Sequence, residues 1–415
     1  MKEKEKAPIS EGKGKNDVTQ DKNNFLNSNE LGDNIIFRVG DSFLKKISRF
    51  DIRGNEVEDY ICLKKETITD LFGKDVIRKI PYYDSETIVP QNENYKRVLG
   101  SSINRYFPPD TLPAYEDGAF PTWSKLIEHI FSVQSALGWK YLALLYKKPL
   151  QILPVLVLVS EENSTGKSTF GNALSYLFGR NVGFYSQMDL SSSFNVWQKS
   201  LVAIFEEINE TKSTIDKLKA ISTARLTTIN EKFRPQVSFT PFCKVIINSN
   251  NVDSVLHLTE NDIRFWVLKV PKFKEFDALF DDKLKDEAPF VLRYLSEFSN
   301  KDLGNPKSRM FFAPDEIRTT ALEDIIEESK SPLEKDIRIW YNEQKSVNNE
   351  MDFGFLICEI YEAFGKKYAQ NEISKCLRKE MKLSNQLRQY TDRYGNTRIG
   401  RAYSLNTLNT PLTHF

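Results

Sequence analysis

The sequence predicts an α/β protein whose central element is a parallel sheet that carries a phosphate-binding loop. Residues 155–159 (VLVLV) form a short apolar run, which is typical of a fully buried strand. A polar turn follows and ends in Gly166-Lys167-Ser168-Thr169, and a segment with apolar residues at helical spacing comes next. Strand, loop, Gly-Lys-Ser and helix is the context that makes a phosphate-binding loop credible. A chance Gly-Lys-Ser in a surface turn is the alternative, and both flanks argue against it.

The residue types of this loop suit ATP and Mg²⁺. Backbone N–H groups and the helix N-terminus would face the phosphates, and Lys167 would place a positive charge at their β/γ end. The hydroxyl of Ser168 is the expected Mg²⁺ ligand. One residue departs from the G-x-x-x-x-G-K pattern, because Glu161 stands where the first glycine is usual. The residues expected to bind the nucleotide are Ser164, Thr165, Gly166, Lys167, Ser168 and Thr169.

Composition excludes several other classes of protein. With 415 residues, the chain is expected to form two or three domains. Lys+Arg number 58 and Asp+Glu 57, so any nucleic-acid surface has to be a local patch. The cysteines and histidines are widely scattered, which argues for reduced thiols and a cytoplasmic location, and against a disulfide framework or a protein metal cage. No apolar run approaches the roughly 18 residues that span a bilayer, so we expect no membrane partner.

The chain is expected to divide into five parts. Residues 1–24 contain many lysines and almost no large apolar side chains, which predicts a disordered tail. Residues 25–115 mix hairpin, strand and helix signals and predict an accessory α+β domain of unassigned function. Residues 116–300 are expected to form the ATPase domain, residues 301–350 a helical connector, and residues 351–415 a winged-helix-like DNA-binding domain.

Local patterns give further expectations on both sides of the loop. Residues 34–47 alternate like a hairpin, and residues 65–80 are expected to be helical with a break near Gly73. Thr122 is expected to cap a helix that leads towards the phosphate loop. The apolar residues of that helix recur at helical spacing and are expected to pack in the core: Trp123, Leu126, Ile127, Ile130 and Phe131.

A second apolar run, residues 201–205, ends in Glu206-Glu207. An acid at the tip of a strand beside a phosphate loop can hold Mg²⁺, and a second acid can orient and deprotonate the attacking water. Two glutamates after an apolar run can also be a solvated helix start. Their place after the Gly166-Lys167 pair favours Glu206 as a metal ligand and both acids as catalytic residues.

A β-hairpin is expected over residues 225–244, with Lys232, Phe233 and Arg234 at its tip. Charge for phosphate and a ring for stacking, together on a protruding hairpin, suit contact with single-stranded DNA. An ordinary solvated hairpin is the alternative.

Two more apolar runs follow the hairpin. Residues 245–251 end in polar amides, and Asn250 is expected to position the water opposite the γ-phosphate. Arg264 stands at the start of the run within residues 261–270. It either pairs with a local acid such as Asp262 or serves the nucleotide of a neighbouring subunit as an arginine finger, and both interpretations stay open.

Towards the C-terminus, residues 352–405 are expected to form two helices and then two short strands, an order that resembles a winged helix. Residues 375–401 contain eight Lys or Arg and two acids, so this part carries the basic patch that the overall balance hides. A solvated basic face without a DNA-binding role is the alternative.

Taken together, the order of these features resembles the superfamily 3 helicases, which are replicative motors of DNA viruses and mobile elements. The hairpin before the Asn-bearing strand is the most specific feature, since most other ATPases lack it there. In papillomavirus-type helicases the hairpin lysine is followed by histidine, whereas Phe233 here keeps only the stacking capacity. The residues that carry the resemblance are Gly166-Lys167-Ser168-Thr169, Glu206-Glu207, Lys232-Phe233, Ser249-Asn250 and Arg264.

Residues 102–108 and 149–169 are similar to the helicase parts of phage and plasmid primase-helicases, and specifically to the helicase half of a phage primase-polymerase. No pair of aspartates of the primase or polymerase kind is found in the sequence. The resemblance therefore implies a fragment or a separate subunit, with a primase-polymerase domain supplied in cis or in trans. It covers residues 103–272 well, the C-terminal part weakly and residues 1–100 hardly at all.

This resemblance implies an AAA+-like ATPase core that assembles into a homo-oligomeric ring, usually a hexamer, with ATP bound between subunits. Lys167, Ser168, Glu206, Glu207 and Asn250 would act from one subunit, and an arginine finger from the next. The ring would move 3′ to 5′ along single-stranded or forked DNA, in the host cytoplasm if the protein is phage-encoded. The alternatives are a DNA-binding initiator or loading factor without processive unwinding, and a non-motor phosphate-loop ATPase.

Overall fold

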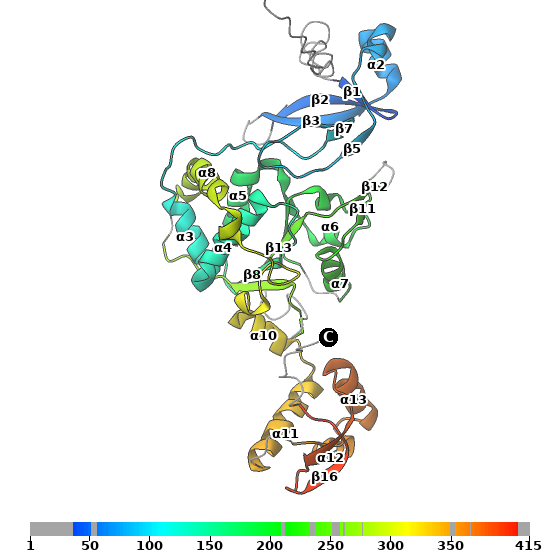
Figure 1. Ribbon diagram of the computed structural model, residues 1–415, viewed down its shortest axis with the longest axis vertical. Helices are drawn as coiled ribbons and strands as arrows, with labels where there is room; N and C mark the ends of the chain where they lie inside the picture. Colours follow the sequence, from blue (N-terminus) through cyan, green and yellow to red (C-terminus); the bar gives the residue numbers. More distant parts are fainter. Residues whose placement is uncertain are drawn as a thin grey trace, which may run out of the picture.

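The computed structural model describes residues 36–50, 56–208, 212–231, 237–250, 258–259, 262–275, 277–348, 353–365 and 367–405. Figure 1 shows a β-rich N-terminal part, a central α/β part and a smaller C-terminal part following one another along the longest axis. The expected disordered tail, residues 1–24, and the hairpin-tip residues Lys232, Phe233 and Arg234 lie outside the described residues. Within the described ranges, no helix is long and apolar enough to cross a membrane.

The central part contains the predicted parallel sheet. Its strands follow the spatial order β14-β8-β13-β10-β9, and every neighbouring pair is parallel. The strands are β8 (Val155–Val159), β9 (Val182–Tyr185), β10 (Val202–Glu206), β13 (Lys244–Ser249) and β14 (Phe265–Lys269). Because β13 lies between β8 and β10, its carboxyl end is flanked by the phosphate loop on one side and by the two glutamates on the other.

Helices cover both faces of this sheet, which explains why its strands are predominantly apolar. Alternate residues of β8 face opposite sides, so Leu156 and Leu158 belong to one core while Val155, Val157 and Val159 belong to the other. The first core includes residues of α3 (Pro121–Phe131), α4 (Ser135–Lys147), α5 (Lys167–Phe178) and α8 (Phe280–Glu297). The second includes residues of α6 (Gln187–Ser191), α7 (Lys212–Ile221) and α10 (Thr320–Glu328).

The expected cap at Thr122 is wrong. Helix α3 begins at Pro121, its N-cap residue is Phe120, and no side chain of the N-cap accepts a hydrogen bond. The first-turn donors instead reach Glu287 of α8, whose carboxylate accepts from Thr122 N at 2.9 Å, Thr122 Oγ1 at 2.7 Å and Trp123 N at 3.1 Å. Proline fits the first helical position well, so the helix starts two residues earlier than a cap at Thr122 would allow. The five apolar residues of the α3 stripe are buried, as expected.

The N-terminal part contains two small sheets, with orders β3-β2-β1-β4 and β5-β7-β6. The expected hairpin and the helix break at Gly73, which has φ of 84°, are both present. The first sheet is built from β1 (Ile36–Val39), β2 (Ser42–Phe50), β3 (Glu56–Leu63) and β4 (Tyr82–Tyr83), and the second from β5 (Ser85–Thr87), β6 (Val98–Leu99) and β7 (Ser102–Asn104). Helix α2 (Lys65–Phe72) and the 3₁₀ turn Lys74–Arg78 follow β3.

The C-terminal part has the expected order of helix, helix and antiparallel hairpin. Ile337, Trp340 and Tyr341 of α11 belong to its core, together with residues from the helices that follow. The elements are α11 (Pro332–Asn348), α12 (Ile357–Ala363), α13 (Gln370–Lys375), the π turn Cys376–Glu380, β15 (Gln386–Thr391) and β16 (Thr397–Ala402). The short helix α9 (Asn300–Leu303) precedes α10 in the connection from the central part.

Candidate active site

The loop between β8 and α5 has the backbone conformation that a phosphate-binding loop needs. Gly166, at the N-cap of α5, has φ of 87°, and Ser164 has φ of 61°. A Cβ at Gly166 would lie 2.4 Å from the ring of Phe273, so both the backbone angle and the space require glycine. Glu161 has no positive φ. The position where the first glycine is usual therefore does not demand glycine in this protein.

Lys167 is fixed by three oxygens from two parts of the chain, its own loop and the end of β13. Its ammonium donates to the hydroxyls of Ser160 and Thr165, the latter at 3.2 Å, and to Oδ1 of Asn250 at 2.8 Å. The residue is only 7% exposed. Burial lowers the pKa of Lys167, and the charges of Glu206 and Glu207 oppose this shift. The positive charge is thus held in place before any phosphate arrives.

Glu206 ends β10 and faces the first turn of α5. Its Oε1 accepts from Ser168 Oγ at 3.4 Å and from Asn248 Nδ2 at 2.9 Å. Two oxygens on one Mg²⁺ ion, each about 2.1 Å from it, lie roughly 3 Å apart, so this hydroxyl and this carboxylate fit one ion. Asn248 Oδ1 is buried and has no hydrogen-bond partner among the described residues, which leaves a further acceptor beside them.

Glu207 faces the same site because the chain turns sharply at that residue. Successive residues of a regular strand point to opposite faces of the sheet. Glu207 instead has φ of 50°, and its N–H donates to Asn248 O at 2.9 Å. A non-glycine residue in the left-handed region is uncommon, and such strain concentrates at functional sites. Both glutamates therefore lie at the carboxyl edge of the sheet.

Asn250 joins the phosphate-loop lysine to the second acid. Its Oδ1 accepts from Lys167, and its Nδ2 lies 3.4 Å both from Asn163 Oδ1 and from Glu207 Oε1. The structure therefore brings together most of the predicted site residues at one edge: Thr165, Lys167, Ser168, Glu206, Glu207 and Asn250.

Three residues that the sequence interpretation missed also take part in this edge. Ser160 accepts from Lys167, Asn163 faces Asn250, and Asn248 donates to Glu206. Asn248 directly follows the apolar residues 245–247 of β13 and is itself only 1% exposed. A buried amide after an apolar run was the available signal, because such a group needs a polar partner.

Arg264 lies at the opposite side of the sheet, where the amino ends of the parallel strands meet. Its carbonyl accepts from the N–H of Val155, the first residue of β8, whereas the phosphate loop follows the last residue of that strand. Five residues of strand separate the two edges, which is about 13 Å or more. Arg264 and the site around Lys167 are therefore not brought together within one chain.

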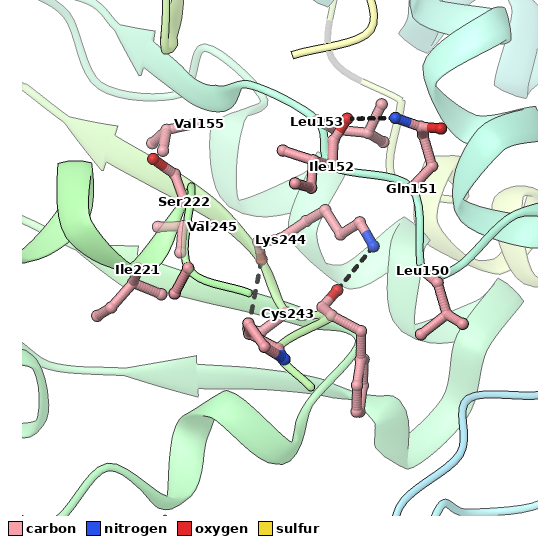
Figure 2. Close-up of a pocket in the computed structure, with 13 residues that line it drawn as sticks. Leu150, Gln151, Ile152, Leu153, Val155, Ile221, Ser222, Cys243, Lys244 and Val245 are labelled. Carbon is pink, nitrogen blue, oxygen red and sulfur yellow. Dashed lines mark hydrogen bonds between the residues drawn. The ribbon is translucent and has the colours of Figure 1, made fainter. Parts of the chain in front are cut away.

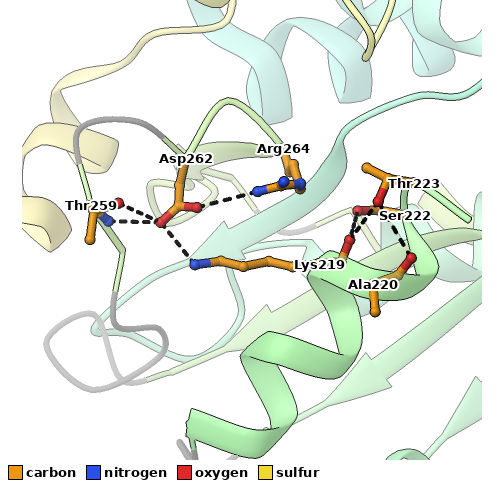
Figure 3. A network of polar contacts seen from close by, with 7 residues as sticks. All are labelled: Lys219, Ala220, Ser222, Thr223, Thr259, Asp262 and Arg264. Atoms are coloured by element: carbon orange, nitrogen blue, oxygen red, sulfur yellow. Dashed lines mark hydrogen bonds and ion pairs between the residues drawn. The ribbon is translucent and has the colours of Figure 1, made fainter.

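The guanidinium of Arg264 belongs to the polar network in Figure 3, where Nη1 is 3.6 Å from Asp262 Oδ1. Asp262 also accepts from Lys219 Nζ at 2.9 Å and from the N–H and hydroxyl of Thr259. Burial raises the pKa of Asp262, but the hydrogen bonds from Lys219 and Thr259 outweigh burial and leave the pKa below its ordinary value. The local ion pair expected for Arg264 is thus present.

A cavity of about 30 Å³ lies near the amino ends of β8 and β13 (Figure 2). Its volume suits a water molecule and is far too small for a nucleotide. Lys244 lines the cavity, and its ammonium donates to the carbonyls of Pro149 and of Phe242, the latter at 2.7 Å. Burial lowers the pKa of Lys244 to about 7. This lysine sits at the edge opposite the phosphate loop.

A parallel sheet with a Gly-Lys-Ser loop at the carboxyl end of an inner strand is the architecture of the phosphate-loop nucleotide-binding proteins. A family model described as a family of unknown function (DUF5906) matches residues 158–264. This span begins at the end of β8 and ends at Arg264. A search of curated protein sequences finds no match.

Among solved structures, the chain is similar to the NrS-1 C-terminal region. One structure of that region has a TM-score of 0.62 at 16% identity, covering 89% of this chain and 96% of that one. Another has a TM-score of 0.61 at 16% identity, covering 86% and 95%. The α/β fold with a parallel central sheet, expected from the sequence, is therefore shared with that region.

Two more distant neighbours are described as helicases. The SCCmec type IV Cch active helicase has a TM-score of 0.38 at 13% identity, covering 89% of this chain and 92% of that one. The JCV helicase has a TM-score of 0.27 at 14% identity, covering 57% and 66%. Scores this low define no common fold.

Proposed function

We propose that the protein is an ATP-dependent DNA helicase that hydrolyses ATP between the subunits of a homo-oligomeric ring and moves along single-stranded DNA. The observation that carries the proposal is the hydrogen-bonded series Lys167–Asn250–Glu207, next to the Ser168–Glu206 pair. These five groups come from three segments of the chain and meet at the carboxyl edge of the sheet, where phosphate-loop proteins bind the nucleotide.

Each of these groups has a separate task in phosphoryl transfer. Lys167 binds the β- and γ-phosphates, while Ser168 and Glu206 are the residues that would hold Mg²⁺. Mg²⁺ supplies charge that neutralises the phosphate oxygens. Glu207 accepts a proton from the attacking water as the new bond to the γ-phosphorus forms and the bond to ADP breaks. Asn250, which already contacts Glu207 and Lys167, orients that water between base and phosphate.

The position of Arg264 favours a role on the nucleotide of a neighbouring copy. Within its own chain it lies at the sheet edge opposite the phosphate loop, so it cannot reach its own γ-phosphate without unfolding β14. A trans arginine accelerates phosphoryl transfer by about 10³–10⁵ in characterised systems. The Asp262 network would hold the guanidinium ready, and one edge of each subunit would then complete the site of the next.

The DNA contacts proposed here are the hairpin and the C-terminal part. The stem of the hairpin, β11 (Thr227–Ile229) and β12 (Val237–Phe239), is antiparallel, and the proposed contact residues Lys232, Phe233 and Arg234 lie between these two strands in the sequence. In the C-terminal part, Arg393 and Arg398 are engaged by Glu362 and Asp392. Arg378 donates to the hydroxyl of Tyr403 at 3.4 Å. The other cations of residues 375–401 are proposed for a winged-helix contact with DNA phosphate: Lys375, Lys379, Lys382, Arg388 and Arg401.

The same proposal includes the partners that the resemblance to superfamily 3 helicases and primase-helicases implies. Single-stranded and forked DNA are the substrates, the assembly is a hexameric ring, and a primase-polymerase domain acts in cis or in trans. ATP with Mg²⁺ is the energy source.

DNA-stimulated ATP turnover tests this function against an assembly switch. A motor hydrolyses ATP continuously and faster on single-stranded DNA, whereas an initiator or loading factor needs ATP only to assemble. We expect steady-state hydrolysis that rises with added single-stranded DNA, and a DNA affinity that falls steeply with salt. ATP-dependent assembly without turnover would favour the loading factor. Turnover indifferent to DNA would favour a non-motor ATPase.

A further inference from the structure

The segment that leaves β14 runs along the phosphate loop. Lys269 Nζ lies 2.8 Å from Glu161 Oε1, and Lys272 Nζ lies 3.7 Å from Glu162 Oε2. Both acids precede the Gly-Lys-Ser motif in the loop. Lys269 is the last residue of β14, and Lys272 lies in the segment that follows it. Two ion pairs thus connect the first residues of the loop to the end of β14 and the segment after it.

The same segment reaches the glycine of the motif through Phe273. The Phe273 ring is stacked on His129 of α3, with centroids 3.8 Å apart and an interplanar angle of 11°. His129 Nε2 lies 3.0 Å from the carbonyl of Thr165 and therefore donates to it. The ring of Phe273 also occupies the space that a side chain at Gly166 would need. His129 of α3 therefore contacts the loop at Thr165, and Phe273, in the segment after β14, lies beside the next residue, Gly166.

We propose that Lys269, Phe273 and His129 are positioning residues that hold the phosphate loop in its nucleotide-binding form, with Lys269 cancelling the charge that Glu161 brings into the loop. The inference rests on the proposed function, because it assigns these residues to nucleotide affinity. It explains how a carboxylate is tolerated at the position of the usual first glycine, in a loop that has to receive a polyphosphate.

The contact between Lys269 and Glu161 should increase nucleotide affinity. The hydrogen bond and charge of Lys269 lower the pKa of Glu161, so its carboxylate is ionised at neutral pH. Without Lys269 the loop would present an uncompensated negative charge to the phosphates, and nucleotide affinity would fall. The pair is exposed, at 54% for Lys269 and 69% for Glu161, so the effect is limited to about fivefold.

A charge-compensation experiment tests the role of Lys269. Lys269→Met should raise the KM for ATP by up to about fivefold and weaken equilibrium binding of a fluorescent ATP analogue to the same degree, with kcat unchanged. Adding Glu161→Gln should restore both values, because the uncompensated charge is gone. Lys283→Met is the matched control, since Lys283 of α8 lies the same 2.8 Å from its own acid, Asp277, and is 50% exposed, close to the 54% of Lys269.

The outcomes separate this inference from the proposed function. An unchanged KM in Lys269→Met, or a double variant no better than the single one, would overturn the charge role even if Lys167→Ala abolishes hydrolysis. If Lys167→Ala hydrolyses ATP normally, the nucleotide site itself is wrongly placed. A lysine that matters only for stability would not give rescue by Glu161→Gln.

A second pair of variants divides the two contacts of His129. His129→Gln retains an N–H donor for the Thr165 carbonyl, and His129→Phe retains the ring that stacks on Phe273. Both should raise the KM for ATP less than His129→Ala does, with kcat and the thermal unfolding midpoint little changed. Equal KM values for His129→Ala and the wild-type chain would rule out the positioning role of His129.

Discussion

The ammonium of Lys167 lies 2.8 Å from Oδ1 of Asn250, a residue 83 positions further along the chain. This contact exists because β8 and β13 are parallel neighbours, so the residues that follow the two strands meet at one edge. Asn250 then reaches Glu207 at 3.4 Å. The side chain of Asn250 thus connects the lysine of the Gly-Lys-Ser loop to Glu207, the residue proposed as the base.

Removing the lysine or the base should stop ATP hydrolysis in different ways. Lys167→Ala should weaken nucleotide binding and abolish turnover. Glu207→Gln should retain binding, because the side chain keeps its shape, and lose about 10²–10⁴-fold in kcat, which is typical for loss of a general base. Steady-state hydrolysis and fluorescent-nucleotide binding separate the two effects. Glu323→Gln on α10 is a control, and normal turnover in Glu207→Gln would remove Glu207 from the mechanism.

Mixing Arg264→Ala with Lys167→Ala chains should reveal whether the arginine acts in trans. Each variant alone should be inactive, but if a site takes Lys167 from one subunit and Arg264 from the next, mixed assemblies contain some sites with both residues and should regain hydrolysis. Hydrolysis is measured across a series of mixing ratios after joint assembly, with Arg318→Ala as the control for loss of an exposed arginine. No recovered hydrolysis at any ratio would contradict a site shared between subunits.

Glu287→Ala should destabilise the central part without touching the nucleotide site. The carboxylate accepts three hydrogen bonds from the first turn of α3, including one from the N–H of Trp123. Leaving buried donors unsatisfied costs about 1–3 kcal/mol each, so we expect a loss of roughly 2 kcal/mol or more in the free energy of unfolding. Urea denaturation measures it. Glu287→Gln keeps an acceptor oxygen and should lose less, and equal stability of Glu287→Ala and wild type would contradict the contact.

Lys244 should make stability depend on pH above neutrality. Burial lowers its pKa to about 7 in the folded chain, against an ordinary value of 10.5. Between these values the unfolded chain binds the extra proton, so the free energy of unfolding should rise with pH by up to about 1.4 kcal/mol per unit.

The clean window for this effect is about pH 7 to 9. Burial raises the pKa of the neighbouring Cys243 to about 12 from 9.0, and this works in the opposite direction above pH 9. Urea unfolding of Lys244→Met should lose the rise within the window. A variant with the same slope as wild type would show that the ammonium is not desolvated when folded.

Much of the central fold could be predicted from local patterns. The apolar runs gave the strands because residues buried on both faces of a parallel sheet cannot alternate with polar ones. The Gly-Lys-Ser motif located the loop, and the acids, the amide and Arg264 fell at strand ends as expected. Their roles in catalysis stay predictions.

The remaining features depend on contacts between distant segments. Thr122 resembled a cap because the pattern could not show that Glu287, 165 positions away, serves the same donors. Glu161 looked like a defect in the loop because its partner Lys269 lies 108 positions away. His129 and Phe273 had no sequence signal, since each is an ordinary aromatic residue until the two stack beside Gly166.

The most direct test of the central claim is unwinding of a forked duplex by the wild-type chain and by Lys232→Ala, with ATP hydrolysis recorded in the same reactions. We predict that the wild-type chain separates the strands only with hydrolysable ATP and unwinds a 3′-tailed duplex faster than a 5′-tailed one. Lys232→Ala should keep its basal hydrolysis but lose both unwinding and stimulation by DNA. Hydrolysis without strand separation by the wild-type chain, or normal unwinding by Lys232→Ala, would contradict the proposed helicase function.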